Sequence, residues 1–319
     1  MSQRAVVFAY HEVGVRSLAV LLELGLTVPL VVTHEDDPAE QRWFASVREL
    51  CAWAGIPCIT PTRPNAPAVV AAVRAAAPDW LFSFYYRRLL GAELLALPTR
   101  GAFNLHGSLL PHYRGRAPVN WAVLHGERQT GASLHRMVEE PDAGALVDQQ
   151  AVPILTNDRA DRVFGRIVCA AETLLLRTVP RMLAGTHEES PLDLAAGSYY
   201  GGRRPEDGRV DWTRSAWDVH NLIRAVAPPY PGAFTEVGGR RLALLGSHFQ
   251  GESARGAGAR LYWEGAACYV DCADARRTRI TRLALGDEDL TAARFRAAFG
   301  SDILELPILM TRAVGPASA

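Results

Sequence analysis

Polar side chains that could carry out chemistry are concentrated in one short segment, residues 104–118. Asn104 and His106 are two residues apart, so on an extended backbone their side chains leave the same face. An amide N–H can stabilise a developing oxyanion, and an imidazole can exchange a proton near neutral pH. Side by side, these two groups suit the transfer of an acyl group.

A third residue, Asp142, is the best candidate to orient the histidine. It lies in the sequence Glu139-Glu140-Pro141-Asp142, just before Ala-Gly, and this pattern predicts an exposed turn. An ionised carboxylate beside His106 would favour the imidazolium form of the ring. Asn104, His106 and Asp142 are therefore the candidate catalytic set. From spacing alone, an ordinary structural role as turn or strand-end residues stays open for each of them.

Two rival chemistries start from neighbouring residues. Ser108 suggests a serine hydrolase, but the Gly-x-Ser-x-Gly turn that exposes such a nucleophile does not surround it. His106 and His112 are six residues apart, and no His-Glu-x-x-His pattern occurs, so no metal site is expected.

All 34 basic residues are arginine, which excludes a Schiff-base lysine and a phosphate loop ending in Gly-Lys-Ser/Thr.

The composition of the 319 residues limits the class of partner. The 34 basic and 34 acidic residues cancel, so no bulk positive field would attract nucleic acid or an anionic membrane. The first apolar run is too short for a signal sequence or a membrane span. The five cysteines are Cys51, Cys58, Cys169, Cys268 and Cys272. They form no Cys-x-x-Cys pair and look like reduced thiols, so we expect a cytoplasmic protein.

The hydrophobic pattern of the first 200 residues predicts the elements that must position the candidate residues. Short apolar runs alternate with helical patterns, which is typical of a parallel sheet covered by helices on both faces. Between Tyr10 and Leu18 only Gly14 is present, so the dinucleotide fingerprint is missing and NAD binding is disfavoured. The predicted strands are 5–9, 28–32, 80–84, 102–106, 132–138 and 145–154, and the predicted helices are 15–22, 39–54, 66–76, one starting at Pro118, and 159–183.

The pattern changes after a turn-rich connection at residues 198–208. A helix is predicted at 217–226, and short apolar runs punctuated by glycine follow, with the spacing of a small barrel or sandwich. These runs are 233–237, 242–245, 267–272 and 280–285. We therefore expect a first domain over residues 1–203, a second over 204–306 and a tail over 307–319.

The motifs resemble those of the folate-dependent formyltransferases. The matching residues are Asn104-x-His106-x-Ser-Leu-Leu-Pro111, the Arg114-Gly115 pair, and a Gly131-Ala-Ser133 strand that leads to Asp142-Ala-Gly144. The resemblance covers nearly the whole chain. It implies a Rossmann-like catalytic domain followed by a small OB-like β-barrel, and formyl transfer from 10-formyltetrahydrofolate without a metal.

Within this family, the sequence resembles the enzymes that formylate UDP-4-amino-4-deoxy-L-arabinose for lipid A modification and polymyxin resistance. The resemblance rests on residues 33–38, 82–87, 101–107 and 134–138. Where methionyl-tRNA formyltransferases carry a basic insertion, this chain has Glu35, Asp36, Asp37 and Glu40, which would repel tRNA phosphate. The dehydrogenase half of the bifunctional members is absent, so we expect a separate UDP-sugar dehydrogenase/decarboxylase or a different amino sugar.

The resemblance also implies roles for particular residues. Asn104 would stabilise the oxyanion, His106 would relay the proton of the amine, and Asp142 would hold the ring. The folate site would contain Arg88, Leu89, Leu90, Arg116, Val138, Glu139, Glu140, Pro141 and Asp142. The nucleotide-sugar site would contain Tyr113, Arg114, Arg203, Arg204 and Tyr230, with the neighbourhood of Trp212.

Three alternatives remain: another nucleotide-linked amino sugar as acceptor, methionyl-tRNA as acceptor, and a folate-binding regulator without catalysis. The intact Asn104, His106 and Asp142 argue against a regulator. A monomer is the default expectation for the oligomeric state.

Overall fold

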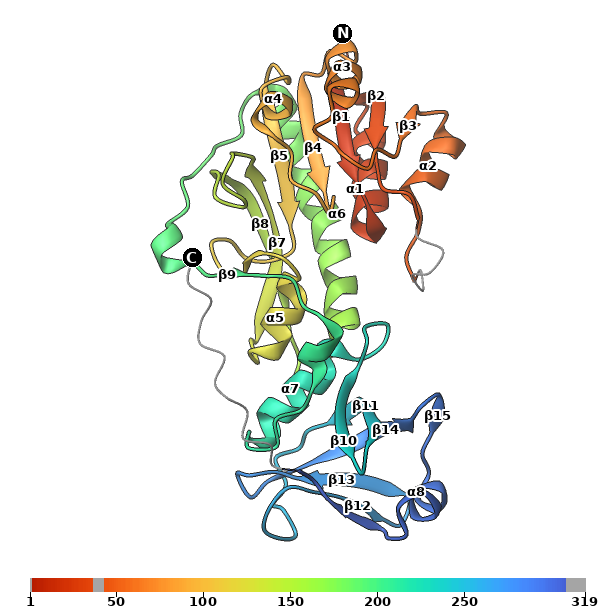
Figure 1. Ribbon diagram of the computed structural model, residues 1–319. Helices are drawn as coiled ribbons and strands as arrows, with labels where there is room; N and C mark the ends of the chain where they lie inside the picture. The colour runs from red at the N-terminus through yellow and green to blue at the C-terminus, as the bar shows by residue number, and fades with distance from the viewer. Residues whose placement is uncertain (1, 37–42, 308–319) are drawn as a thin grey trace. The chain divides into compact units, whose positions relative to one another are not determined.

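The sheet that carries the candidate residues has seven strands in the order β3-β2-β1-β4-β5-β7-β8 (Figure 1). The structure is a computed structural model that describes residues 2–36 and 43–307. Asp37, Glu40 and the starting residues of the predicted 39–54 helix lie outside the described residues, as does the tail from 308 onward. The strands are β1 (Arg4–Ala9), β2 (Thr27–Val32), β3 (Cys58–Ile59), β4 (Trp80–Phe84), β5 (Gly101–His106), β7 (Gln129–Arg136) and β8 (Leu146–Pro153).

The expected parallel sheet is confirmed in its first five strands, and two antiparallel strands, for which the pattern predicted no direction, extend it. Strands β1 to β5 are parallel, whereas β7 pairs antiparallel with β5 and β8 pairs antiparallel with β7. An apolar run shows that a segment is buried in a sheet but carries no signal for its direction. The reversal matters because it sets β7 directly beside the candidate residues of β5.

Helices cover both faces of this sheet, as the pattern predicts. Alternate residues of β1, such as Val6 and Phe8, share one core cluster with Val69 and Val73 of α3. The helices in the first 200 residues are α1 (His11–Glu23), α2 (Val47–Ala54), α3 (Pro67–Ala75), α4 (Ala92–Leu95), α5 (Pro118–Leu124) and α6 (Ala160–Ala184), and most of α5 belongs to the second of the two compact units. Glycine at position 185, with φ 71°, follows the long helix α6.

Helix α2 begins later than its polar pattern predicts. Residues 43–46 are not helical, and the helix starts at Val47. Ser46 is extended, and its side chain accepts a hydrogen bond from the backbone N–H of Glu49. This N-cap ends the preceding loop and fixes the first turn of the helix.

The chain divides into two compact units, and each draws on more than one segment. The first contains residues 1–119, 129–153 and 163–202, and the second contains 120–128, 154–162 and 203–319. The second unit therefore includes two short excursions from the first half of the chain. The predicted boundary at residues 203/204 stays a prediction.

The second unit contains a curled antiparallel sheet on which helix α7 (Ala216–Val226) packs. Its strand order is β10-β11-β14-β13-β12-β16, and within the described residues the two end strands do not pair with each other, so the sheet is a half-barrel. The pattern missed β12, β15, β16 and α8, which are five, two, three and eight residues long. The strands are β10 (Ala233–Val237), β11 (Arg240–His248), β12 (Arg260–Glu264), β13 (Ala267–Asp271), β14 (Arg277–Leu285), β15 (Glu288–Asp289) and β16 (Ile303–Glu305), with α8 at Ala292–Phe299.

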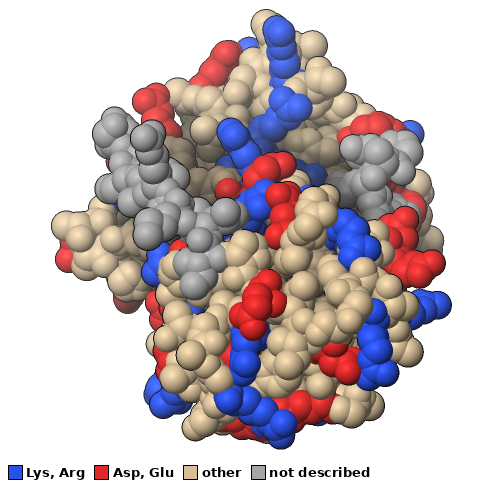
Figure 2. All heavy atoms as spheres, turned by 60° about the horizontal axis from the view of Figure 1, so that its bottom comes forward, with Lys and Arg blue, Asp and Glu red and all other residues tan. Residues whose placement is uncertain are grey.

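The remaining elements are small: a two-stranded sheet of β6 (Arg114–Gly115) and β9 (Tyr199–Tyr200), and two 3-10 turns, η1 (Leu194–Ala196) and η2 (Pro205–Gly208). On the face drawn in Figure 2, arginine and acidic side chains are interspersed instead of gathering by sign. In the described part of the chain, no helix has both the length and the apolar character needed to cross a bilayer.

Candidate functional site

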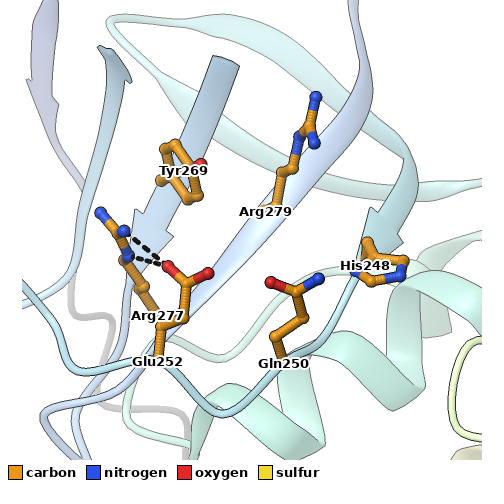
Figure 3. A pocket seen from close by; sticks show the side chains of 6 residues that line it. All are labelled: His248, Gln250, Glu252, Tyr269, Arg277 and Arg279. Atoms are coloured by element: carbon orange, nitrogen blue, oxygen red, sulfur yellow. Dashed lines mark hydrogen bonds and ion pairs between the residues drawn. The ribbon is translucent and has the colours of Figure 1, made fainter.

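A small polar hollow lies on the sheet of the second unit (Figure 3). Its volume is about 40 Å³, which is room for a few waters and far below the size of a substrate pocket. Arg277 forms ion pairs with Glu252 and Glu264, at 2.5 and 2.9 Å, and lies over the ring of Tyr269. Because these contacts already neutralise its charge, we do not place the active site here.

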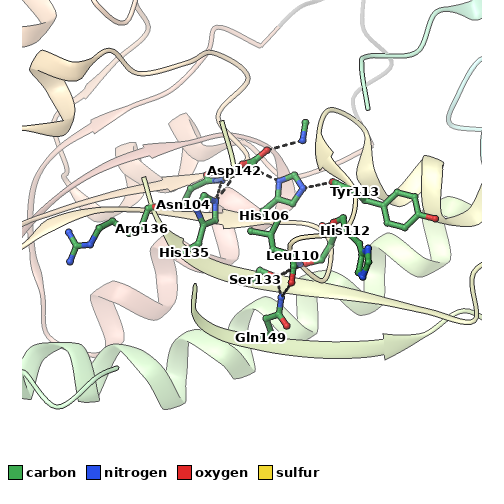
Figure 4. A network of polar contacts seen from close by, with 12 residues as sticks. Asn104, His106, Leu110, His112, Tyr113, Ser133, His135, Arg136, Asp142 and Gln149 are labelled. Carbon is green, nitrogen blue, oxygen red and sulfur yellow. Dashed lines mark hydrogen bonds and ion pairs between the residues drawn. The ribbon is translucent and has the colours of Figure 1, made fainter. Parts of the chain in front are cut away.

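The candidate catalytic residues meet in the first unit, at the carboxyl end of β5 (Figure 4). The antiparallel pairing of β5 with β7 sets Asn104 opposite His135 and His106 opposite Ser133. Asn104 and His106 share one face of β5 because they are two residues apart. Ligands of open α/β sheets bind at this edge, beyond the carboxyl ends of the parallel strands.

The carboxylate of Asp142 is the centre of the cluster. Its Oδ1 lies 3.5 Å from Nδ1 of His106 and 3.4 Å from Nδ2 of Asn104. A second histidine, His135, places its Nε2 at 3.5 Å from the same oxygen. The other carboxylate oxygen accepts a hydrogen bond from the backbone N–H of Gly115 at 2.9 Å. The structure therefore brings together all three predicted residues and adds His135.

The expectation that Asp142 sits in an exposed turn is wrong, since its side chain is only 13% exposed. Its φ of 55° lies in the left-handed region, which aspartate tolerates better than most residues. Two positions later, a Cβ on Gly144 would lie 2.0 Å from the carbonyl oxygen of Arg136. The turn therefore folds back closely onto the end of β7 and carries the carboxylate inward.

Burial of Asp142 acts to raise the pKa of its carboxyl, but the surrounding groups outweigh this effect. Positive charge on His106 and the hydrogen bond from the backbone N–H of Gly115 act to lower it, and the pKa of Asp142 lies well below its usual range. The group is therefore an anion at any pH at which the protein works.

The ring of His106 is also held from its other side. Its Nε2 lies 2.8 Å from the carbonyl oxygen of Tyr113, to which it donates, so a neutral His106 has its free lone pair on Nδ1. Tyr113 has φ 57°, and this uncommon conformation accompanies the inward turn of its carbonyl. The nitrogen of His106 that can take up a proton is therefore the one beside Asp142.

The loop after β5 is tied down by serine hydroxyls. Ser108 donates to the carbonyl of His112 at 2.6 Å and is fully buried, which is unlike an exposed hydrolase nucleophile. Ser133 accepts from the N–H of Leu110 and donates to the carbonyl of Ser108. Gln149 from β8 donates to both Leu110 and Ser133. These bonds give Ser108 and Ser133 structural roles.

Apart from Arg116, the predicted folate residues fall on two segments of the first unit, residues 88–90 and 138–142. Leu89 is 69% exposed and Val138 is 44% exposed, although their neighbours Leu90 and Met137 belong to the same core cluster. Asn65 donates to the carbonyl of Leu89 and so braces the first segment. Arg88, Arg116, Glu139 and Glu140 are exposed, while Pro141 and Asp142 are half-buried.

The predicted acceptor residues divide between the two units. In the first unit, Arg114 forms an ion pair with Glu140 at 3.0 Å, and Tyr113 stacks on Tyr200. In the second unit, Arg203 lies over the ring of Trp121, Arg204 is exposed and Tyr230 is half-buried. Burial raises the pKa of Tyr230 to about 12, so its hydroxyl stays protonated.

No cluster of three or more His, Cys, Asp and Glu suited to a metal ion is found among residues 2–36 and 43–307. The Asn104, His106 and Asp142 cluster at the edge of an α/β sheet, together with a half-barrel unit, defines an enzyme of the acyl-transfer class. Family models agree with this class. The formyl transferase model matches residues 22–179, and the model of the formyl transferase C-terminal domain matches residues 203–299. The chain belongs to the formyltransferase family.

Several solved structures share this fold. An N-formyltransferase from Helicobacter canadensis, in complex with folinic acid and dTDP-3-aminofucose, matches with a TM-score of 0.70 and 18% identity over 88% of this chain and 99% of that chain. WlaRD, a sugar 3N-formyltransferase solved with dTDP and 5-N-formyl-THF, matches with a TM-score of 0.71 and 16% identity over 90% and 99%. HypX from Aquifex aeolicus, in complex with tetrahydrofolic acid, matches with a TM-score of 0.64 and 18% identity over 94% and 48%.

Proposed function

We propose that this formyltransferase transfers the formyl group of 10-formyltetrahydrofolate to the amine of a nucleotide-linked amino sugar, and that the acceptor is UDP-4-amino-4-deoxy-L-arabinose. The observation that carries the proposal is the convergence of Asn104 and His106 on the Asp142 carboxylate. Structural neighbours that were solved with a folate and a dTDP-sugar or dTDP support the substrate class. The motif resemblance supports the particular sugar.

The cluster fits direct attack of the amine on the formyl carbon. Asn104 donates an N–H to the oxyanion that develops on the formyl oxygen. His106 accepts a proton from the attacking nitrogen at Nδ1, and Asp142 stabilises the resulting imidazolium. The bond from the formyl carbon to N10 of the folate then breaks, and N10 takes up a proton. The products are the N-formyl sugar and tetrahydrofolate, so neither a covalent enzyme intermediate nor a redox partner is needed.

The donor site is proposed to lie along residues 88–90 and 138–142. Exposed apolar side chains such as Leu89 and Val138 suit contact with the flat pterin ring, and the backbone of both segments offers hydrogen-bonding groups for its polar edge. Arg116 is exposed and suits the glutamate carboxylates of a folate.

The residues proposed to recognise the acceptor are Tyr113 and Arg114 in the first unit and, separately, Arg203, Arg204 and Tyr230 in the second unit, because guanidinium and aromatic groups recognise diphosphates and bases. Transfer to methionyl-tRNA is disfavoured, since Glu35 and Asp36 stand where a basic segment would be needed. Their charge is partly offset, because Glu35 pairs with Arg48 and Asp36 accepts from Ser46. In the cell, we place this reaction in the cytoplasm, in lipid A modification, with a separate UDP-sugar dehydrogenase/decarboxylase to supply the substrate.

The test is formyl transfer by the purified protein. It is incubated with 10-formyltetrahydrofolate and, in parallel, UDP-4-amino-4-deoxy-L-arabinose, dTDP-linked 3-amino and 4-amino sugars, or methionyl-tRNA, and formylated products are measured by mass spectrometry. We expect the UDP-sugar to give the highest kcat/KM. A preference for a dTDP-sugar would overturn the acceptor assignment, and activity on methionyl-tRNA alone would overturn the substrate class.

Variants connect that activity to the cluster. Asn104→Ala and His106→Ala are expected to lower kcat by about 100-fold or more, the usual cost of losing an oxyanion donor or a proton-transfer group. His112→Ala is the matched control, because its side chain is exposed and only its backbone carbonyl takes part in the loop. Folded Asn104 and His106 variants with near wild-type turnover would overturn the mechanism.

A further inference from the structure

His135 is absent from the predicted site residues, yet it lies opposite Asn104 in the β5–β7 pair and is only 2% exposed. Its Nδ1 is 2.8 Å from the carbonyl oxygen of Arg136. A carbonyl can only accept, so Nδ1 carries the proton, and the neutral ring has a free lone pair on Nε2. That lone pair faces Nδ2 of Asn104 at 3.1 Å.

The three contacts between His135, Asp142 and Asn104 form a nearly equilateral triangle. Nδ2 of Asn104 is 3.1 Å from Nε2 of His135 and 3.4 Å from Oδ1 of Asp142. The Nε2 of His135 and the Oδ1 of Asp142 are 3.5 Å apart. The two acceptors therefore subtend roughly 60° at Nδ2, whereas the two N–H bonds of an amide diverge by about 120°. One N–H pointing between the two acceptors serves both of them, and the second N–H of Asn104 points elsewhere.

The same triangle decides which end of the amide faces inward. If the Asn104 amide turned over, its oxygen would meet the lone pair of His135 and the anionic oxygen of Asp142, and both contacts would be repulsive. Asp142 alone would allow the amide to rotate about a single anchor. The neutral His135 adds a second anchor, and its own orientation is set by the backbone carbonyl of Arg136.

We propose that His135 is a positioning residue for formyl transfer: in its Nδ1–H form it shares one N–H of Asn104 with Asp142 and so leaves the other N–H to donate to the oxyanion. This inference rests on the proposed function. The two histidines beside Asp142 then hold their protons on different nitrogens, because His106 donates from Nε2 and His135 donates from Nδ1.

Kinetics of two replacements of similar size test the role. His135→Leu removes the acceptor, and His135→Gln keeps an amide oxygen that can accept from Asn104. We expect His135→Leu to lower kcat by about 30-fold, less than outright loss of the donor, with both KM values within about threefold. His135→Gln should recover kcat to within about fivefold of wild type. His187→Leu is the matched control, since His187 pairs with Glu189 and contacts the rings of Trp80 and Phe103 but none of the cluster residues, and its kcat should change by less than about twofold.

A double-mutant comparison separates positioning from general loss of structure. In an Asn104→Ala background there is no amide to orient, so adding His135→Leu should leave the residual kcat unchanged within about twofold. If His135→Leu lowers kcat by the same factor with and without Asn104, the effect does not pass through the amide and the proposal is wrong.

Histidine side-chain 15N NMR of the wild-type protein supplies a readout that needs no substrate. We expect His135 in the Nδ1–H form at neutral pH, and replacement of His135 identifies its signals. A protonated Nε2 on His135 would overturn the positioning role, as would wild-type turnover by the folded His135→Leu variant. If His135 has the expected form but the wild-type protein formylates none of the amines offered, the proposed function fails and the hydrogen-bond arrangement stands.

Discussion

Replacement of Asp142 by asparagine removes a charge while it keeps the size and shape of the side chain. At 3.5 Å from Nδ1 of His106, the carboxylate stabilises a protonated ring by roughly 5 kcal/mol at an effective dielectric constant of about 20. The proton is only partly transferred in the transition state, so about half of this energy is lost from the barrier. At about 1.4 kcal/mol per factor of ten, kcat of Asp142→Asn should fall roughly 60-fold.

The assay measures the release of tetrahydrofolate, which gives kcat at saturating donor and acceptor and a KM for each of the two substrates. Both KM values should stay within about threefold, because the neutral amide fills the same space. Burial acts to raise the pKa of Asp142, but positive charge on His106 and the hydrogen bond from Gly115 act to lower it, and the pKa lies well below its usual range. Since even an ordinary aspartate has a pKa of about 3.9, the wild-type carboxylate is ionised from pH 6 to 9. The ratio of wild-type kcat to Asp142→Asn kcat should therefore be the same across that range.

Asp193→Asn is the matched control, since Asp193 is exposed and caps a short turn in a way that asparagine can also do. Its kcat should equal that of the wild type. A folded Asp142→Asn variant with kcat within threefold of wild type would refute the electrostatic role. A large rise in the donor KM at unchanged kcat would show that Asp142 acts in folate binding alone, without the electrostatic role.

Two further predictions concern stability. A Cβ at Gly115, where φ is 95°, would lie 2.2 Å from the carbonyl oxygen of Tyr200, so Gly115→Ala should lower the free energy of unfolding by about 2 kcal/mol or more. Gly165 lies in helix α6 with open space around it, so Gly165→Ala should raise the free energy of unfolding by about 0.5 to 1 kcal/mol. Urea unfolding measures both changes, and equal effects would contradict the reasoning. Burial lowers the pKa of His220 to about 4 in the folded state, against about 6.5 when unfolded. The unfolded protein therefore binds the proton more readily, and the free energy of unfolding of the wild type should fall by up to about 3 kcal/mol as the pH falls from 6.5 to 4. His220→Gln should lack this part of the pH dependence, and parallel curves for both proteins in urea unfolding at pH 7 and 4.5 would show that His220 is not the group responsible.

The hydrophobic pattern predicts the elements of the first unit well where they are long or fully apolar. The strand at residues 80–84 matches β4, and the helix at 159–183 matches α6 within one residue at each end. In these segments the burial of every second or every third to fourth side chain leaves a clear period. The polar stretch before Val47 has no such period, and there the predicted helix begins too early.

The sequence predicts Asn104, His106 and Asp142 as site residues, but it predicts neither the burial of Asp142 nor the presence of His135. His135 belongs to the motif at residues 134–138, but only the antiparallel register of β7 sets it across from Asn104. Asp142 reads as exposed because Pro and Gly around it are typical of surface turns. Its burial depends on contacts from distant residues, such as the N–H of Gly115, that local sequence does not encode.

The left-handed backbone at Asp142 and the tight approach of Gly144 to Arg136 also affect how relatives of this enzyme can be interpreted. Few residues other than Asp, Asn and Gly tolerate such a conformation, so the shape of the turn itself favours an Asp-x-Gly pattern. A descendant that had lost catalysis could retain the pattern for folding alone. The cross-strand pair of an asparagine and a histidine has no comparable backbone requirement, and its loss would be the better sign that formyl transfer has been abandoned.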